Sequence, residues 1–274
     1  MFKRIFSGAV GIALILGIIF FSSAVPILID IFVALVSAVA VSEFTAATKT
    51  IRLLPISVAS ITFAFVYPML LNYDMGLIIW YIYTAVMLSM MIFNHKNISF
   101  LQFAYVYSMT VIITLSMSTV IMMKDMDIDH SAFYFVLALA LPWLTDAGAY
   151  FAGTFFGKHK LCPEISPKKT IEGAIGGTLF CILSTCVLGY VFSQWIFVGT
   201  VSVNYWYLML LSFFGSLFSI LGDLSFSLVK RSFKIKDYGN LIPGHGGVLD
   251  RFDSVIFVAP FLYIMVKYLP VLNI

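Results

Sequence analysis

Long apolar stretches dominate the chain, and short polar connections separate them. Nine such stretches recur from end to end, and each approaches the ~20 apolar residues that a helix needs to cross a bilayer. Helices are expected because backbone polar groups in lipid need internal partners, and because the stretches lack the alternating pattern of a membrane barrel. The predicted spans cover residues 5–21, 25–41, 53–71, 75–93, 98–123, 131–151, 174–192, 203–224 and 252–274.

Composition supports a membrane protein and excludes an ordinary water-soluble globule. Of the 274 residues, 61% are hydrophobic and only 11% are charged, whereas soluble domains carry about 25% charged residues. The formal net charge of +3 is too small to indicate a nucleic-acid partner. The three cysteines, Cys162, Cys181 and Cys186, have no ligand-like spacing and are expected to be reduced thiols. The predicted fold class is therefore all-α, a polytopic integral membrane protein with nine transmembrane helices.

The distribution of basic residues predicts the orientation of the chain in the membrane. With nine spans, fourteen Lys and Arg residues lie on the side of the N-terminus, and only Lys124 and Lys267 lie on the other side. Because cytoplasmic connections are enriched in Lys and Arg, the N-terminus is predicted to be cytoplasmic. The first stretch could also be a signal peptide, but its length of 17 residues exceeds a usual signal core, and we expect it to be retained.

Polar residues are concentrated in the second half of the chain. Residues 1–130 have short connections and almost no intramembrane charge, and they are predicted to form N-terminal transmembrane helices that anchor the protein or contact partners. Residues 131–274 are predicted to form a catalytic transmembrane region, because two long cytoplasmic connections there are dense in Lys, Gly, Pro and His. In the first half, Asp30 is expected to be a solvated carboxylate near the outer interface, and Glu43 an interface charge.

Four aspartates of the second half are candidates for a metal site. Asp146 and Asp223 lie inside predicted spans, where a carboxylate costs at least ~2.5 kcal/mol unless it has a partner, a metal or water. Asp250 and Asp253 lie three residues apart at the start of the last span and therefore share a helix face. Ion pairs between helices, or a helix N-terminus that favours acids, would also account for these residues. Because carboxylate oxygens suit Mg²⁺, the predicted site is one for magnesium.

Glycines, lysines and hydroxyl groups near these aspartates indicate binding of an anion. The run Pro-Gly-His-Gly-Gly precedes Asp250 and can bring several backbone N–H groups to one anion. The run Ser-Pro-Lys-Lys-Thr precedes the seventh span, and such groups beside a helix start favour phosphate. A flexible turn within the positive charge expected of any cytoplasmic loop is the open alternative. The candidate residues are Ser166, Lys168, Lys169, Thr170, Lys230, Arg231, Lys236, His245, Gly246, Gly247 and Arg251.

These motifs resemble those of a known enzyme family. Over residues 227–253, the sequence Ser-Leu-Val-Lys-Arg, then Lys-Asp, then Pro-Gly-His-Gly-Gly-Val-Leu-Asp-Arg-Phe-Asp closely resembles the C-terminal motif of the bacterial phosphatidate cytidylyltransferases, also called CDP-diacylglycerol synthases. The likeness extends to residues 146–158 and 166–173, whereas the first half matches only as a set of apolar spans. One departure is Phe226, which stands where the family often has a glutamate.

The resemblance implies an enzyme of phospholipid biosynthesis that joins CTP to phosphatidic acid, giving CDP-diacylglycerol and pyrophosphate with Mg²⁺. It also implies a multi-pass protein of the inner (plasma) membrane whose active site faces the cytoplasm, and it suggests a homodimer. By the same resemblance, the metal ligands would be Asp223, Asp250 and Asp253, with Asp146 in a secondary role. The catalytic residues would be Asp223, Asp250, Asp253, Lys230, Arg231 and His245, and the substrate-binding residues Ser166, Lys168, Lys169, Thr170, Lys236, Gly246, Gly247 and Arg251.

Two other functions would account for part of the pattern. Another magnesium-dependent lipid phosphotransferase, such as a CDP-alcohol phosphotransferase or a polyprenol kinase, would use similar groups. The first of these should carry its aspartates in one Asp-Gly-rich helical motif, which this sequence does not contain. A cation-coupled transporter would place Asp146 and Asp223 near the membrane midplane within repeated halves, and the sequence shows neither feature.

Overall fold

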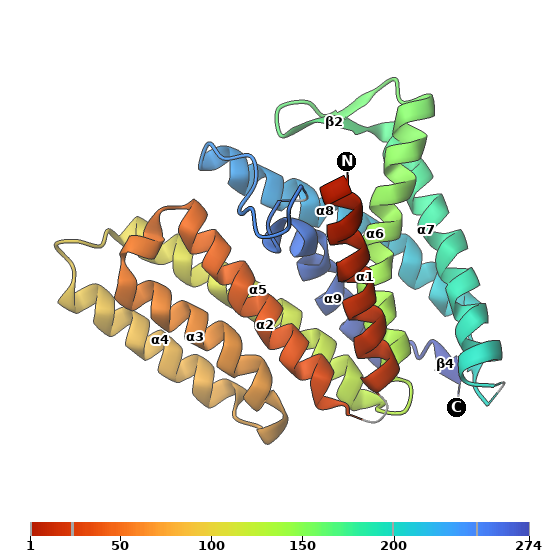
Figure 1. Cartoon of the computed structure of the whole chain (residues 1–274), viewed down its shortest axis with the longest axis horizontal. Helices are drawn as coiled ribbons and strands as arrows, with labels where there is room; N and C mark the ends of the chain where they lie inside the picture. Colours follow the sequence, from red (N-terminus) through yellow and green to blue (C-terminus); the bar gives the residue numbers. More distant parts are fainter. Residues whose placement is uncertain (1, 23–24, 199, 245, 274) are drawn as a thin grey trace. The chain divides into compact units, whose positions relative to one another are not determined.

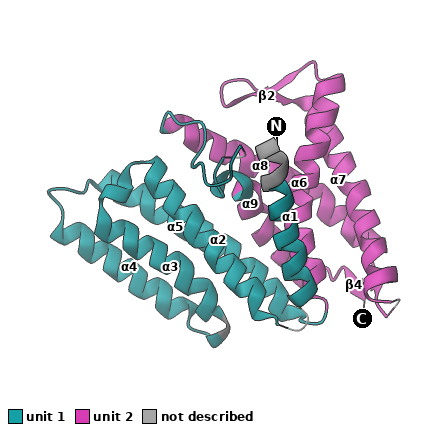
Figure 2. Cartoon of the chain, viewed as in Figure 1, with its two compact units in different colours: residues 1–129, 233–252 teal, residues 130–232, 253–274 magenta. Residues whose placement is uncertain are grey.

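The chain folds into helices that form two compact units. The computed structural model describes residues 2–22, 25–198, 200–244 and 246–273. Unit 1 consists of Met1–Asp129 and Phe233–Phe252, and unit 2 consists of His130–Ser232 and Asp253–Ile274 (Figure 2). The segment Phe233–Phe252 therefore belongs to the same compact unit as the N-terminal helices. Whether residues 131–274 carry the catalysis stays a prediction.

Unit 1 is a helical bundle (Figure 1). Its elements are α1 (Phe2–Ser22), α2 (Ile27–Ala47), η1 (Thr50–Arg52), α3 (Leu54–Leu70), η2 (Leu71–Tyr73), α4 (Gly76–Phe93) and α5 (Phe100–Met126). Helix α2 packs against α1, α3 and α5, and α3 also packs against α4 and α5. Ser99 defines the start of α5, because its hydroxyl accepts the N–H of Gln102 at 3.2 Å while the Gln102 side chain accepts the N–H of Ser99 at 3.0 Å.

Unit 2 combines helices with two small antiparallel sheets. Its elements are α6 (Ser131–Phe156), β1 (Lys160–Cys162), β2 (Ser166–Thr170), α7 (Ile171–Val191), the π-helical turn η3 (Phe192–Ile196), β3 (Ser202–Val203), α8 (Tyr205–Ser232), α9 (Leu249–Tyr268) from Asp253 onward, and β4 (Leu272–Asn273). Strands β1 and β2 form a hairpin that extends beyond the ends of α6 and α7 (Figure 1). Strand β3 pairs with β4, which attaches the C-terminal segment to the connection between α7 and α8.

Helices α6 and α7 approach each other closely through small residues. A Cβ at Gly148 of α6 would lie 2.6 Å from the Cβ of Phe180 in α7. A Cβ at Gly177 of α7 would lie 2.6 Å from the carbonyl oxygen of Thr145 in α6. Glycine at both positions therefore permits the backbone contact, as is common where helices associate in a membrane.

The predicted helices are present. Within the described residues, an α-helix lies at the position of each of the nine predicted spans. Six of the described helices are long and apolar enough to cross a bilayer, namely α2, α4, α5, α6, α7 with its π turn, and α8; α1 and α3 contain shorter apolar stretches. The chain is therefore a predominantly helical, multi-pass membrane protein, which confirms the predicted fold class at this level.

Two predicted boundaries were wrong. Helix α8 continues to Ser232, so Lys230 and Arg231 lie in its last turn and not in the following loop. A helix needs no apolar side chains to continue, and cations are favoured at its C-terminal end. Helix α9 ends at Tyr268 and not at residue 274, because Pro270 disfavours helical backbone at the residue before it.

The expectation that Asp30 is solvated was also wrong. Asp30 of α2 is only 6% exposed, and its Oδ1 lies 2.5 Å from Nζ of Lys124 in α5, which is 4% exposed. The two charges reach each other because α2 packs against α5. The position of Asp30 near the end of a span did not predict this pairing, which depends on the neighbouring helix.

Candidate functional site

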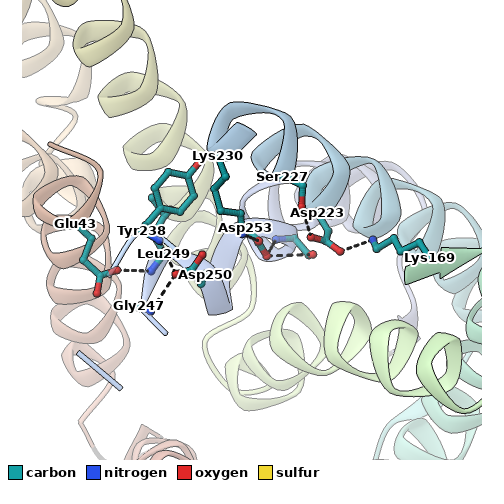
Figure 3. A network of polar contacts seen from close by, with 11 residues as sticks. Glu43, Lys169, Asp223, Ser227, Lys230, Tyr238, Gly247, Leu249, Asp250 and Asp253 are labelled. Carbon is teal, nitrogen blue, oxygen red and sulfur yellow. Dashed lines mark hydrogen bonds and ion pairs between the residues drawn. The ribbon is translucent and has the colours of Figure 1, made fainter. Parts of the chain in front are cut away.

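The segment that precedes α9 folds around the carboxylate of Asp250. We call this segment, residues 233–248, the Asp250 loop. Oδ2 of Asp250 accepts the backbone N–H of Tyr238 at 2.8 Å and that of Gly247 at 3.0 Å (Figure 3). Gly246 has a φ of 89°, a left-handed conformation that favours glycine. The sequence predicted that backbone N–H groups of the glycine run bind an anion. In the structure the N–H of Gly247 is bound to Asp250, and binding of a phosphate by this run stays a prediction.

A cavity of about 340 Å³ lies against the Asp250 loop. Lys236, Gly246 and Arg251, which were predicted to bind substrate, all contribute to its lining, together with Asp237. Two cationic side chains beside a glycine turn are suited to hold an anion such as phosphate. His245, also predicted to act here, lies outside the described residues.

In unit 2, two aspartates and two lysines meet from three segments of the chain. Asp223 of α8 forms an ion pair with Lys169 of β2, and it accepts the hydroxyl of Ser227 at 3.3 Å (Figure 3). Asp253 of α9 lies with Oδ2 3.7 Å from Nζ of Lys230 in α8. Both members of this second pair are less than one-tenth exposed. The structure thus brings together four of the residues that the sequence predicted as catalytic, substrate-binding or metal-binding.

A second cavity of unit 2, of about 180 Å³, joins further predicted residues. Asp146, Lys168, Lys169 and Thr170 all line it. Asp146 is also near enough to Asp253 to interact with it electrostatically, as Asp223 is. The predicted intramembrane aspartates therefore belong to one electrostatic environment with the lysines of β2.

The hairpin of β1 and β2 is fixed by local polar contacts at the start of α7. The hydroxyl of Thr170 accepts the N–H of Gly173 at 3.1 Å and so caps the helix. Glu172 accepts the N–H groups of Lys158 and His159 at 3.1 Å and 3.2 Å, which ties the end of α6 to the start of α7. Thr170, predicted to bind substrate, thus has a structural partner. These contacts set the position from which β2 presents its lysines.

Three further positions that the sequence analysis named, Arg231, Ser166 and Phe226, lie in unit 2. The side chain of Arg231 donates from Nε to the carbonyl oxygen of Ile165 at 3.4 Å, so the end of α8 contacts the hairpin. Ser166 is the first residue of β2 and is half-buried. Phe226 is 2% exposed and packs edge-on against Phe257, with ring centroids 6.4 Å apart. The position where the family resemblance leads one to expect a glutamate is therefore part of the apolar core.

Glu43 is a residue of this region that sequence reasoning missed. It was expected to be an interface charge, but it is 8% exposed, and its Oε2 accepts the N–H of Leu249 at 2.8 Å (Figure 3). The expectation was wrong because α2 packs where the Asp250 loop returns to α9. Since the contact joins residues 206 apart in the sequence, no local pattern could have revealed it.

The oxygen donors of unit 2 suit Mg²⁺ by their chemistry. Among the described residues, no three Asp, Glu, His or Cys side chains form a metal-binding cluster. Mg²⁺, however, is usually bound through one or two carboxylates, with water and substrate phosphates as the remaining ligands. Asp223 and Asp253, each beside a lysine that can bind phosphate, fit that arrangement.

Comparison with known proteins identifies the family. The sequence model of the cytidylyltransferase family matches residues 2–269. A phosphatidate cytidylyltransferase of Bacillus subtilis (strain 168) is 41% identical over 173 residues, which are 63% of this chain and 60% of that protein. Phosphatidate cytidylyltransferases of Staphylococcus epidermidis and Staphylococcus aureus (strain COL) are each 49% identical over 132 residues, 48% of this chain and 48% of each relative. The chain thus spans between 48% and 60% of the length of these relatives. Because the family model extends over nearly the whole chain, the protein belongs to the cytidylyltransferase family.

Proposed function

We propose that the protein is a phosphatidate cytidylyltransferase, which converts CTP and phosphatidic acid into CDP-diacylglycerol and pyrophosphate. Its family and the names of its relatives support this proposal. The observation that carries it is the ion pair between Lys169 and Asp223, in the same unit as the pair between Lys230 and Asp253. Two polyanionic substrates repel each other, and cations together with metal-binding oxygens can supply the positive charge that holds them in one place.

The proposed reaction needs no general base. The phosphate of phosphatidic acid is already an anion at neutral pH, and one of its oxygens attacks the α-phosphorus of CTP. The new P–O bond forms as the bond to the β-phosphate breaks, and pyrophosphate leaves with the electron pair. Lys169 and Lys230 would neutralise charge that develops on the phosphates. Lys236 of the Asp250 loop and Arg251, which follows the loop, would bind further phosphate oxygens.

Magnesium is the metal that we propose for this site. Asp223 and Asp253 would hold it, and Asp146 and Asp250 are the further candidate ligands. When bound, the metal would withdraw negative charge from the phosphates and help to align them. The proposal is supported by the oxygen-only donor set and by the neighbouring lysines, which provide positive charge at the same carboxylates.

We further propose nine transmembrane spans with a cytoplasmic N-terminus and an active site that faces the cytoplasm from the inner membrane. The fourteen-to-two division of basic residues supports this orientation. CTP is water-soluble and phosphatidic acid lies in the bilayer, so the site must be reached from both. A homodimer, which only the family resemblance suggests, is tested by light scattering of the purified protein in detergent.

Pyrophosphate release tests the proposed reaction. Purified protein in detergent would be supplied with CTP and MgCl₂, with and without phosphatidic acid, and Asp223→Asn would be assayed alongside. We expect release that requires both substrates and the metal and that is lost in the variant. Release without the lipid would identify a nucleotide hydrolase. No release by folded protein with any tested phosphatidic acid would overturn the proposal.

A further inference from the structure

The carboxylate of Glu43 lies buried where α2 meets the Asp250 loop. Its Oε2 accepts the backbone N–H of Leu249, the first residue of α9, at 2.8 Å. The first N–H groups of a helix have no partners within the helix, and a carboxylate satisfies them well. Glu43 thus supplies from another helix the cap that α9 needs at its start.

Two glycines of the loop lie directly against this carboxylate. A Cβ at Gly239 would lie 2.4 Å from Oε1 of Glu43, and a Cβ at Gly247 would lie 2.4 Å from Oε2. Both distances are far shorter than any ordinary contact between non-bonded atoms. The Asp250 loop therefore contacts Glu43 twice, at Gly239 and again at Gly247. Any larger side chain at either glycine would push the loop and the Glu43 carboxylate apart.

The same stretches of the loop hold Asp250. Gly247 donates its N–H to Asp250, and Tyr238, next to Gly239, donates the other N–H. The ring of Phe44, the residue after Glu43, packs against the ring of Tyr238 at 6.1 Å. Consequently the two halves of the loop that bind Asp250 are also the halves that contact Glu43 and Phe44.

Burial of this carboxylate carries a cost that the visible hydrogen bond offsets only in part. Within the described residues, Oε1 of Glu43 has no hydrogen-bond partner. A buried polar atom without a partner costs about 1–3 kcal/mol, and more when the group is charged. A buried group that carries such a cost is typical of a residue that holds a functional segment in one conformation. Glu43 lies on α2, outside residues 131–274, which were predicted to be the catalytic region.

We propose that Glu43 is a positioning residue for the nucleotide phosphates. By holding Gly239, Gly247 and Leu249, it would keep the Asp250 loop in the conformation that places Lys236 and Arg251 at the cavity of about 340 Å³. Its effect would reach the substrate only through the loop. The kinetic part of this inference rests on the proposed function, whereas the role in holding the loop does not.

Two variants test the contact between Glu43 and the Asp250 loop, one on each side of it. Glu43→Ala removes the carboxylate, and Gly239→Ala introduces a methyl group against it. We expect each to raise the KM for CTP about tenfold or more, equivalent to ~1.4 kcal/mol, with a smaller change in the KM for phosphatidic acid. The three atoms nearest to the added methyl group all belong to the Glu43 side chain, so Gly239→Ala should cost less in a Glu43→Ala background than in the wild type. Glu43→Gln should be milder than Glu43→Ala. Ser42→Ala is the matched control, since the Ser42 hydroxyl bonds the carbonyl of Val39 within α2.

Limited trypsin digestion provides a readout that does not depend on activity. The loop contains Lys234 and Lys236, and cleavage there should be faster in Glu43→Ala and Gly239→Ala than in the wild type or Ser42→Ala. Unchanged cleavage together with a CTP KM within twofold of the wild type would overturn the proposal. If the effects of Glu43→Ala and Gly239→Ala on the KM for CTP were additive in the double variant, direct contact between the two positions would be ruled out as their cause. Faster cleavage in a protein without cytidylyltransferase activity would retain the positioning role and reject the proposed function instead.

Discussion

Lys169, the penultimate residue of a short β-strand, forms an ion pair with Asp223, which lies within the long helix α8. The hairpin that carries Lys169 is fixed by the capping of α7, and α7 packs against α8. The pair therefore links the polar connection between α6 and α7 to an aspartate inside a predicted span. Substitution of either partner should therefore lower the activity.

Removal of the Lys169 charge should impair the reaction strongly. Lys169→Ala leaves Asp223 without this cation and removes a group that we propose to bind phosphate, so we expect kcat/KM to fall about 100-fold, equivalent to ~2.7 kcal/mol. Lys169→Arg should retain part of the activity, because it keeps the charge. Lys160→Ala, at an exposed lysine of the same hairpin, is the control. Equal losses in Lys160→Ala and Lys169→Ala would show that general positive charge, and not this pair, matters.

Loss of a proposed metal ligand should change the magnesium requirement. For Asp223→Glu and Asp253→Glu we expect the MgCl₂ concentration at half-maximal activity to rise about tenfold, because each keeps a carboxylate but moves its oxygens. Initial rates over a MgCl₂ series give this value directly. Asp74→Asn, at an exposed aspartate with a φ of 56° that asparagine tolerates, serves as the control. An unchanged magnesium dependence with a lower maximal rate would assign these aspartates to substrate and not to the metal.

The buried pair of Asp30 and Lys124 should matter for stability and little for catalysis. Asp30→Asn removes the buried partner charge of Lys124 and leaves the ammonium only the more exposed Asp125, whose Oδ1 lies 3.2 Å from Nζ. Breaking a fully buried pair typically costs about 3–5 kcal/mol, so we expect a loss of stability that Asp125 keeps below that range. Replacing both residues, as in Asp30→Leu with Lys124→Met, should recover much of that loss. Thermal unfolding in detergent measures the stability, and pyrophosphate release per folded molecule measures activity. A stability loss as large in the double variant as in the single one would contradict this account.

Thr170 offers a test of capping against substrate binding. Its hydroxyl caps α7, so Thr170→Ala should lower the free energy of unfolding by about 1 kcal/mol, whereas Thr170→Ser should keep most of the stability. Chemical unfolding followed by tryptophan fluorescence gives the free energies. If the hydroxyl serves only as a cap, the KM for either substrate should stay within twofold in folded Thr170→Ala as well as in Thr170→Ser. A KM that rises for CTP in Thr170→Ala without loss of stability would instead favour the predicted substrate contact.

The helices of the chain could be predicted from local sequence alone. An apolar stretch of sufficient length specifies a membrane helix wherever it lies, since lipid leaves the backbone few alternatives. The capping residues Ser99 and Thr170 mark helix starts within a few positions of those predicted. The motif around Asp250 likewise marked the segment that lines a cavity with Lys236 and Arg251, and its binding of an anionic substrate stays a prediction.

The pairing of charges was decided by tertiary structure. Most helices here are apolar around much of their circumference, so the sequence does not indicate which faces meet. Helix packing buried Asp30 against Lys124 and Glu43 against the Asp250 loop, although both acids had been assigned to interfaces. It also allowed Lys169 to reach Asp223. A carboxylate in a low-dielectric interior must find a partner, and only the arrangement of distant helices and loops determines which partner that is.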